Sequence, residues 1–343
     1  MTQFAFGAGN MYITLLNDAF GNAISNPTPV PLLVLQEGSI DMSADAKELY
    51  GQQQFAAAVA RGKAKLTVKV KPARIFAAVW NALFFGQTLT SGLFANYTDT
   101  VGDVIPPASV GGVTGLTVVA GGTGYVTGDI ITVGTGTSTA KATAYVTASA
   151  GVVTGLQVIN SGSYTVAPSA SGATTGGTGT GLTVTATVTA SGVIAYPQAL
   201  GVSGMGSTFV ADMGVFYALT STPLKRVASA PAAGQYMVNP ATGIYTFSAA
   251  DAGLSVYINY QYTQPSTTAQ TQTVQNLPMG YAPTFKADLT VSYLGKLTTF
   301  SILKSTSTKM SLGFKNEDFM IPEFDFSAMD NGTGNVMTWS TSE

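Results

Sequence analysis

Four lysines at alternating positions in residues 61–71 are the side chains of this chain most able to act through charge. The lysines are Lys63, Lys65, Lys69 and Lys71, and together with Arg61 and Arg74 they make six cations with no acid among them. Lysine and arginine supply most contacts to phosphate groups, so one interpretation is a surface for a polyanion. The aromatic residues that usually accompany lysines in single-strand nucleic-acid grooves are absent. We therefore favour an edge strand protected by lysine, or a salt-bridged face between subunits.

A group of acidic residues near the C-terminus is the second candidate for chemistry. Its members are Glu317, Asp318, Glu323, Asp325 and Asp330. Carboxylates can hold Ca²⁺ or act as a catalytic pair, but the spacing matches no EF-hand loop. Clusters of charge are most often solvated surface. We favour surface or interface charge, with the lysine strand of a neighbouring subunit as the natural partner.

The absence of certain residue types excludes several kinds of catalytic and metal-binding chemistry. The chain contains no cysteine and no histidine, which removes thiolate nucleophiles, disulfides, the commonest general base and the commonest metal ligand. The glycine-rich stretches 121–124 and 176–179 lack the Gly-Lys-Ser/Thr ending of a phosphate loop and favour turns. Tyr125 and Tyr164 could stack on sugars, although tyrosines more often cap a small β core. We expect no catalytic residues, no metal and no cofactor.

Composition predicts a β-rich protein that assembles with partners. Only 9% of the 343 residues are charged, against a usual quarter, and the net charge is −2. Such low charge favours a surface that is largely buried in an assembly. No apolar run reaches 18 residues, and residues 1–7 do not resemble a signal peptide, so we expect neither a membrane span nor export by a leader.

The elements that must position these residues are mainly strands. The alternation in residues 61–71 predicts a half-buried strand with a cationic face. Pro72 predicts the start of a helix over residues 74–85, which is apolar almost all round and therefore buried, and Gly86 predicts its end. Residues 37–60 and 87–107 are expected to be loops. Further strands are expected at 11–16, 31–35, 209–215, 235–238, 244–247, 255–260, 285–291, 298–303 and 310–314, with a short or edge strand at 321–326.

A sequence repeat divides the chain. Gly-Gly-Val-Thr-Gly-Leu at 111–116 returns as Gly-Val-Val-Thr-Gly-Leu at 151–156, and a weaker third start lies at 191–194. Residues 111–195 contain only two charged side chains, Asp129 and Lys141. Alternating Thr, Val and Ala predict that strands of the two copies pair in one small sandwich or barrel, with the third start as the returning strand. The segment 108–196 is therefore predicted to be a domain inserted into another, formed by 1–107 and 197–343.

The flanks of this insertion resemble bacteriophage tail tube proteins. The resemblance rests on four stretches and their order around one helix: 48–55 (Glu-Leu-Tyr-Gly-Gln-Gln-Gln-Phe), 212–215 (Asp-Met-Gly-Val) with 226–236, 279–285 (Met-Gly-Tyr-Ala-Pro-Thr-Phe), and 315–319 with 322–326. It covers residues 10–107 and 197–340. It implies a mainly β fold, a tail-tube-like antiparallel β-sandwich or barrel with one buried helix. The insertion would be a small all-β domain, Ig-like or built from repeats, that projects outward.

The same resemblance implies a structural virion protein that is not an enzyme. Its copies would form stacked rings, hexameric as is typical of the family, and the genome would pass through them into the host. The implied partners are further copies, other tail proteins such as the tape measure, terminator and baseplate or tip, and double-stranded DNA that passes without specific binding. The implied location is the virion tail, assembled in the host cytoplasm.

A lysine row in the lumen would hold DNA, since each neutralised phosphate adds binding. We therefore expect Lys63, Lys65, Lys69 and Lys71 at a subunit interface, opposite Glu317, Asp318, Glu323 and Asp325. The alternative to a tube subunit is a capsid decoration or host-attachment protein whose repeat domain binds carbohydrate.

Overall fold

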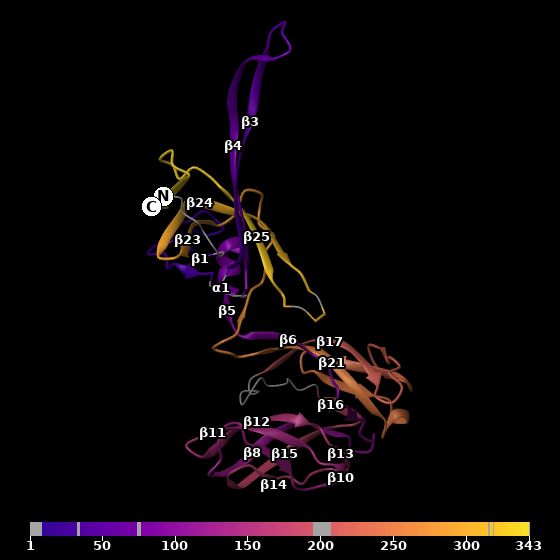
Figure 1. Ribbon diagram of the computed structural model, residues 1–343. Coiled ribbons are helices and arrows are strands. Elements are labelled where there is room, and N and C mark those ends of the chain that lie inside the picture. The colour runs from indigo at the N-terminus through magenta and orange to yellow at the C-terminus, as the bar shows by residue number, and fades with distance from the viewer. Residues whose placement is uncertain are drawn as a thin grey trace. The chain divides into compact units, whose positions relative to one another are not determined.

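The protein is built almost entirely from antiparallel strands and divides into two compact units (Figure 1). The structure, a computed structural model, describes residues 9–32, 35–73, 77–194, 207–314, 316–317 and 319–342. Unit 1 comprises residues 1–90 and 271–343, and unit 2 comprises residues 91–270. The expected mainly β class is confirmed. The contacts group residues 91–107 and 207–270 with the repeat segment, whereas the sequence had assigned them to the flanking domain.

Unit 1 is an eight-stranded sheet in the order β2-β1-β23-β24-β25-β4-β3, with β26 paired to β24. Its strands are β1 (Asn10–Asn17), β2 (Val30–Pro31), β3 (Leu35–Tyr50), β4 (Ala56–Pro72), β23 (Thr284–Tyr293), β24 (Lys296–Leu312), β25 (Pro322–Ala328) and β26 (Met337–Thr341). Two further strands, β5 (Thr90–Ser91) and β22 (Gln270–Thr271), pair where the chain passes between the units.

Several expectations for unit 1 are corrected. Residues 37–60 are not a loop, because they form most of β3 and the start of β4 in one long hairpin. Residues 298–314 hold one long strand, β24, rather than two. The strand at 321–326 is not at an edge, since β25 lies between β24 and β4. The polar residues of 37–60 predicted a loop. Both faces of this hairpin are exposed, so its strands do not show the apolar alternation that identifies a half-buried strand.

The described part of the helical segment is less buried than expected. It is described as α1 (Ala77–Trp80) followed by a π-helical turn (Asn81–Phe85), and residues 74–76 lie outside the described residues. Val79 and Leu83 are buried in the core of the sheet, whereas the remaining described side chains of the helix are partly or fully exposed. Gly86 ends the helix as expected, in the left-handed conformation at φ 57°. A Cβ there would lie 2.7 Å from the backbone nitrogen of Ala19, so only glycine fits.

The core of unit 1 lies on one face of the sheet, under the helix. Phe285 and Phe326 meet edge to face at 5.3 Å, and Trp80 meets Phe324 in the same way at 6.2 Å. Val68 and Val70 of β4 belong to this core. Because side chains alternate along a strand, Lys69 between these valines and Lys71 after them are directed to the opposite face. The expected half-buried strand at 61–71 is thus confirmed over its second half.

Unit 2 contains a β-sandwich and a barrel. The sandwich packs the sheet β17-β21-β6, with β7 beside β21, against the sheet β16-β20-β19-β18 around one shared core. Its strands are β6 (Leu93–Tyr97), β7 (Asp103–Val104), β16 (Gly192–Ile194), β17 (Thr208–Tyr217), β18 (Lys225–Arg226), β19 (Gln235–Asn239), β20 (Ile244–Phe247) and β21 (Ser255–Gln264), with a 3₁₀ turn at Ala249–Asp251. Residues 87–107 are therefore not a continuous loop, because β5, β6 and β7 lie within them.

The repeat segment forms a nearly closed six-stranded barrel, as the sequence predicted in outline. The sheet order is β12-β11-β9-β14-β15-β8, and β12 returns beside β8. The barrel strands are β8 (Gly112–Thr123), β9 (Ile130–Val133), β11 (Thr143–Ser149), β12 (Val152–Asn160), β14 (Gly172–Gly176) and β15 (Thr180–Thr189), with β10 (Thr137–Ala140) and β13 (Ser163–Val166) paired outside it.

The two copies exchange strands across the barrel with matching register. The first strand of each copy pairs with the last strand of the other, β8 with β15 and β12 with β11. Val113 of β8 pairs with Val188 of β15, and Val153 of β12 pairs with Ala148 of β11. The two pairs are equivalent, because Val153 lies 40 residues after Val113 and Ala148 lies 40 residues before Val188. The third start at 191–194 is not the returning strand of the barrel. It forms β16, which pairs with β20 of the sandwich.

Candidate functional site

The lysine strand contributes to a charged face on the side of the unit 1 sheet away from the core. We define the charged face as the ionisable side chains there on β3, β4, β23, β24 and β25, which are Glu37, Asp41, Lys65, Lys69, Lys71, Lys286, Asp288, Lys304, Lys309, Glu323 and Asp325. Among the described residues these are six lysines and five carboxylates. The face is therefore nearly balanced in charge, although β4 alone is strongly basic.

Neighbouring strands supply the acids that balance β4. Lys71 Nζ lies 2.5 Å from Glu37 Oε2 on β3, and Glu37 raises the pKa of Lys71 by hydrogen bonding and by its charge. Lys69 stands opposite Asp325 in the register of β4 and β25. The Lys71–Glu37 pair is exposed, and exposed pairs contribute little to stability. The main effect of such neighbouring acids is on the net charge of this surface.

Two more ion pairs extend this balance across the sheet. Lys309 Nζ lies 3.6 Å from Glu323 Oε1, and Lys286 Nζ lies 2.9 Å from Asp288 Oδ2. Asp288 also accepts a hydrogen bond from the Ser301 hydroxyl at 2.5 Å. The sequence had placed Glu323 opposite a neighbouring subunit, whereas the structure places it beside lysines of its own chain.

The remaining predicted interface residues do not join the charged face. Lys63 lies in the irregular part of the β3–β4 ladder, beyond the body of the sheet. Glu317 is exposed in the turn between β24 and β25, and Asp318 lies outside the described residues. Asp330 caps a turn by accepting hydrogen bonds from the backbone N–H groups of Gly332 and Gly334.

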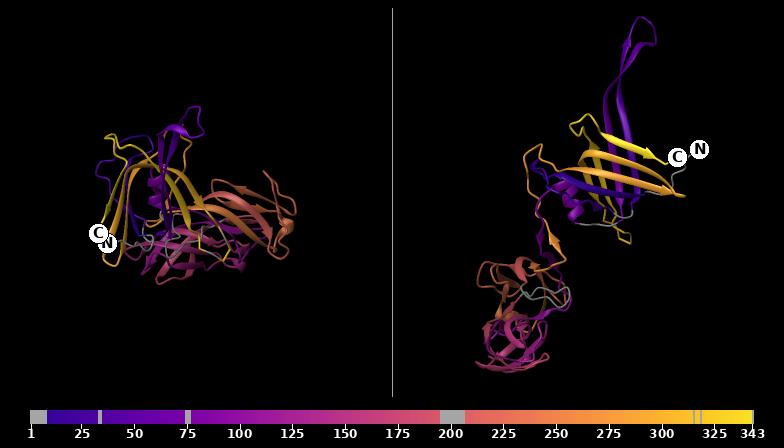
Figure 2. Two further views of the ribbon diagram at one scale, coloured as in Figure 1. Left: turned by 45° about the horizontal axis from the view of Figure 1, so that its top comes forward. Right: turned by 90° about the vertical axis from the view of Figure 1, so that its left-hand side faces the viewer.

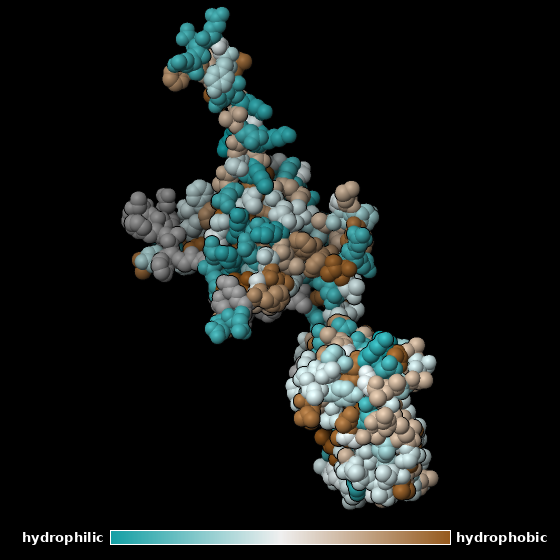
Figure 3. Space-filling model, turned by 90° about the vertical axis from the view of Figure 1, so that its right-hand side faces the viewer, coloured by the Kyte–Doolittle hydropathy of each residue, from teal (hydrophilic) through white to brown (hydrophobic). Residues whose placement is uncertain are grey.

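The β3–β4 hairpin extends past the other strands of its sheet as an arm (Figure 1, Figure 2). We define the arm as residues 43–63 and its tip as residues 48–59. Hydrophilic and hydrophobic residues both lie along it in Figure 3. The tip exposes large apolar side chains, with Phe55 86% and Leu49 66% exposed. Exposed apolar groups gathered at one place indicate a contact surface.

Three buried carboxylates of the sandwich were missed by the sequence analysis. Asp212 accepts hydrogen bonds from the hydroxyls of Tyr236 and Tyr245 at 2.8 and 2.9 Å, and Arg226 Nη1 lies 3.7 Å away. Burial and the Asp212 carboxylate raise the pKa of both tyrosines. Asp251 is bound similarly by the Tyr217 hydroxyl at 2.9 Å.

The third carboxylate, Asp99, accepts hydrogen bonds from the backbone N–H groups of Val101, Gly102 and Ile258. Beside it, burial and the charge of Asp99 raise the pKa of Asp103 to about 7. Abundant tyrosine in residues 209–262 was the available sequence signal for this network. The carboxylates are satisfied by internal donors, so their role is structural.

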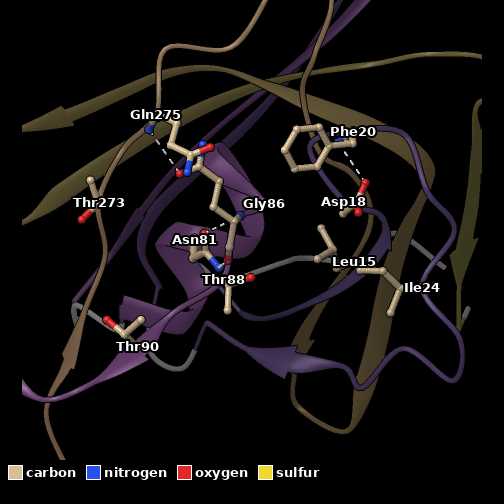
Figure 4. A pocket seen from close by; sticks show the side chains of 11 residues that line it. Leu15, Asp18, Phe20, Ile24, Asn81, Gly86, Thr88, Thr90, Thr273 and Gln275 are labelled. Carbon is tan, nitrogen blue, oxygen red and sulfur yellow. Dashed lines mark hydrogen bonds between the residues drawn. The ribbon is translucent and has the colours of Figure 1, made fainter.

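A cavity of about 550 Å³ in unit 1 is lined mainly by groups that already have internal partners (Figure 4). The Asn81 side chain accepts hydrogen bonds from the Gln87 backbone N–H at 2.9 Å and the Gln272 amide at 2.7 Å. The Asp18 carboxylate accepts from the backbone of Phe20 and from Asn22, and these bonds lower its pKa. The cavity offers no nucleophile paired with a base.

The glycine stretches and tyrosines of the barrel are also structural. Tyr125 and Tyr164 are buried in its two apolar clusters, which supports the core interpretation. The Tyr164 hydroxyl accepts a hydrogen bond from the Ala142 N–H at 2.8 Å. A Cβ at Gly179 would lie 2.4 Å from the Tyr125 ring. That glycine therefore makes room for the buried aromatic ring.

Comparisons with known proteins add no relative: no family model matches the chain, and no curated protein matches it. Within the described part of the chain, no group of three or more acidic side chains is placed to hold a metal ion. The described helices include none long and apolar enough to cross a membrane.

Proposed function

We propose that this chain is a structural virion protein, the subunit of stacked rings that form a phage tail tube. Its partners in this proposal are further copies, other tail proteins, and double-stranded DNA that passes through without specific binding. Its place is the virion tail, assembled in the host cytoplasm, and it has no catalytic activity. The resemblance of residues 10–107 and 197–340 to tail tube proteins motivates the proposal.

The observation that carries the proposal is the charged face of unit 1. A tube for DNA needs a wide polar surface with little net positive charge, because free cations bind phosphates and slow their passage. Six lysines interleaved with five carboxylates provide this. The lysines of β4 stand beside carboxylates of β3 and β25, and in this proposal they make contacts between subunits.

The arm supports self-assembly. A single chain leaves its apolar tip uncovered, and β3 is an edge strand with one free side along much of its length. Long exposed edges are normally protected or paired with another chain. Pairing with a further copy would extend the sheet from subunit to subunit, as the proposed ring requires.

Electron microscopy of the purified protein tests this function directly. Hollow filaments or stacked rings of uniform diameter are the expected result. Isolated trimers that bind glycans would instead support the decoration or attachment alternative. Burial of Tyr125 and Tyr164 removes the two side chains that the sequence had offered for sugar stacking. A protein that stays monomeric under all conditions of salt and concentration would contradict the tube.

A further inference from the structure

A groove at the base of the arm is a second exposed apolar surface of unit 1. It has a volume of about 600 Å³ and lies between the arm and the connection from β25 to β26. Met42 and Leu66 line it from the arm side, and Val336 and Met337 line it from the connection. Its size falls within the roughly 300–1,000 Å³ of pockets that enclose drug-sized ligands. Met42 is 64% and Val336 36% exposed, so these two apolar side chains lack a cover in the single chain, whereas Leu66 belongs to the core.

The tip of the arm has the complementary chemistry. Leu49, Tyr50 and Phe55 present apolar surface there, and Glu48 is the one charged residue of residues 48–60. The Glu48 carboxylate accepts a hydrogen bond from the Tyr50 hydroxyl, which joins the acid to the aromatic side chain. The tip is thus an apolar projection with a charge of −1.

The charge of the groove is opposite. Arg61 and Lys65 contribute +2 and Asp330 contributes −1, giving a net charge of +1 among its lining residues. Asp330 is engaged with backbone N–H groups of its own turn. The two cations are the charges left to meet a carboxylate, and complementary charge favours correct orientation on docking.

A chain cannot place its own tip in its own groove. Eight residues of β3 separate Met42 from Tyr50, and at ~3.3 Å per residue the aromatic end of the tip lies roughly 26 Å beyond Met42. Arg61 stands opposite Ala46, close to Glu48 of its own arm, so Lys65 is the groove cation that needs a second copy to meet this acid. We propose that the tip of one copy docks in the groove at the base of the arm of a second copy, with Phe55 as the apolar anchor and Glu48 directed to Lys65.

This contact joins two different surfaces, so it propagates from copy to copy rather than closing as a symmetric pair. The inference deepens the proposed function and rests on it for the identity of the partner, a further copy of the chain. It assigns the contact between successive copies to two named surfaces of unit 1.

Cysteine crosslinking tests the contact, because the natural chain has no cysteine. One protein carries Gln54→Cys beside Phe55, and another carries Asn335→Cys at the groove; both positions are exposed. A short bismaleimide should join the two proteins when they are mixed. A mixture of Gln54→Cys with Leu294→Cys, which is equally accessible on a turn of unit 1, should give background crosslinking.

Three variants separate docking from accessibility. Phe55→Ser in the Gln54→Cys protein should reduce crosslinking to background without altering the folded state, because this side chain is exposed. Glu48→Lys in the tip protein should reduce crosslinking about two- to five-fold, as expected for an exposed ion pair. Lys65→Glu in the groove protein should restore crosslinking with the Glu48→Lys tip protein.

Three outcomes overturn the contact: crosslinking of Gln54→Cys with itself as efficiently as with Asn335→Cys, equal yield with Leu294→Cys, or no loss on Phe55→Ser. Hollow tubes without tip-to-groove crosslinks would reject this inference alone. Crosslinks of the expected pattern without tubes would keep the contact and reject the tail-tube proposal.

Discussion

At the residue scale, the ionisable groups of this protein act mainly through their immediate neighbours. Lys71 is held by Glu37, whereas Asp212 is enclosed by two tyrosine hydroxyls and approached by Arg226. The Lys71–Glu37 pair affects the charge of an exposed surface, whereas the Asp212 group forms hydrogen bonds in the core of the sandwich. Residue type alone did not distinguish these roles, because the partner strands lie far away in sequence.

Asp103 is expected to make unit 2 less stable as the pH rises. Its pKa is about 7 in the folded chain against 3.8 for a free aspartate, so between these values the folded state holds a proton that the unfolded state has lost. Stability therefore falls from about pH 4 to pH 7 and stays low above it. Asp103→Asn should remove this dependence and stabilise unit 2 at pH 8, by at most about 4 kcal/mol.

Urea unfolding followed by tyrosine near-ultraviolet circular dichroism, at pH 5 and pH 8, measures this effect. Asp129→Asn is a matched control with the opposite sign. Hydrogen bonds from Val126 and Thr178 lower the pKa of Asp129 below its ordinary value of 3.8, so its contribution is present at both pH 5 and pH 8 and Asp129→Asn should lower stability equally at the two. An Asp103→Asn variant that is no more stable than the natural chain at pH 8 would contradict the buried-acid interpretation.

At the element scale, strands with one buried face were predictable and exposed ones were not. The alternation of Leu66, Val68 and Val70 indicated β4 correctly, and Gly86 correctly indicated the end of the helix. The arm was taken for a loop, because both faces of its strands meet solvent and apolar alternation disappears. Likewise the charge balance of the sheet could not be predicted, since Asp325 meets Lys69 only through the pairing of β25 with β4.

The lysines of β4 give the prediction that belongs to this scale. Lys65→Glu with Lys69→Glu changes the charged face by four negative charges and places an acid opposite Asp325. Like charges opposed on a sheet cost about 0.2–1 kcal/mol, so the subunit should still fold. Assembly into tubes should be lost, as measured by sedimentation and electron microscopy.

The control for charge alone is Lys141→Glu with Lys225→Glu, two exposed lysines of unit 2. This variant has the same net charge as the β4 variant and should assemble normally. If the β4 variant forms tubes at normal yield and only DNA passage changes, these lysines belong to the lumen and the interface assignment is wrong.

At the scale of the whole molecule, the repeat is a closed module within unit 2. Its copies exchange first and last strands, so neither copy can complete the barrel alone. The chain enters and leaves the barrel at one place, since a Cβ on Gly111 would lie 2.7 Å from the Cα of Ala190. An insertion whose two ends are adjacent adds little to the entropy cost of closing the loop of the host domain that carries it.

Removal of the barrel should therefore leave assembly intact. Replacing residues 112–189 with a short Gly-Ser linker keeps β16, which pairs with β20 in the sandwich. A deletion over 108–196 would also remove β16 and expose the edge of β20, so it serves as a comparison that is expected to aggregate.

The shorter deletion should give tubes with the same axial repeat as the natural chain by electron microscopy. A variant that keeps the near-ultraviolet signal of the sandwich but no longer assembles would show that the barrel contributes to contacts between copies. The proposed assembly surface would then extend beyond unit 1.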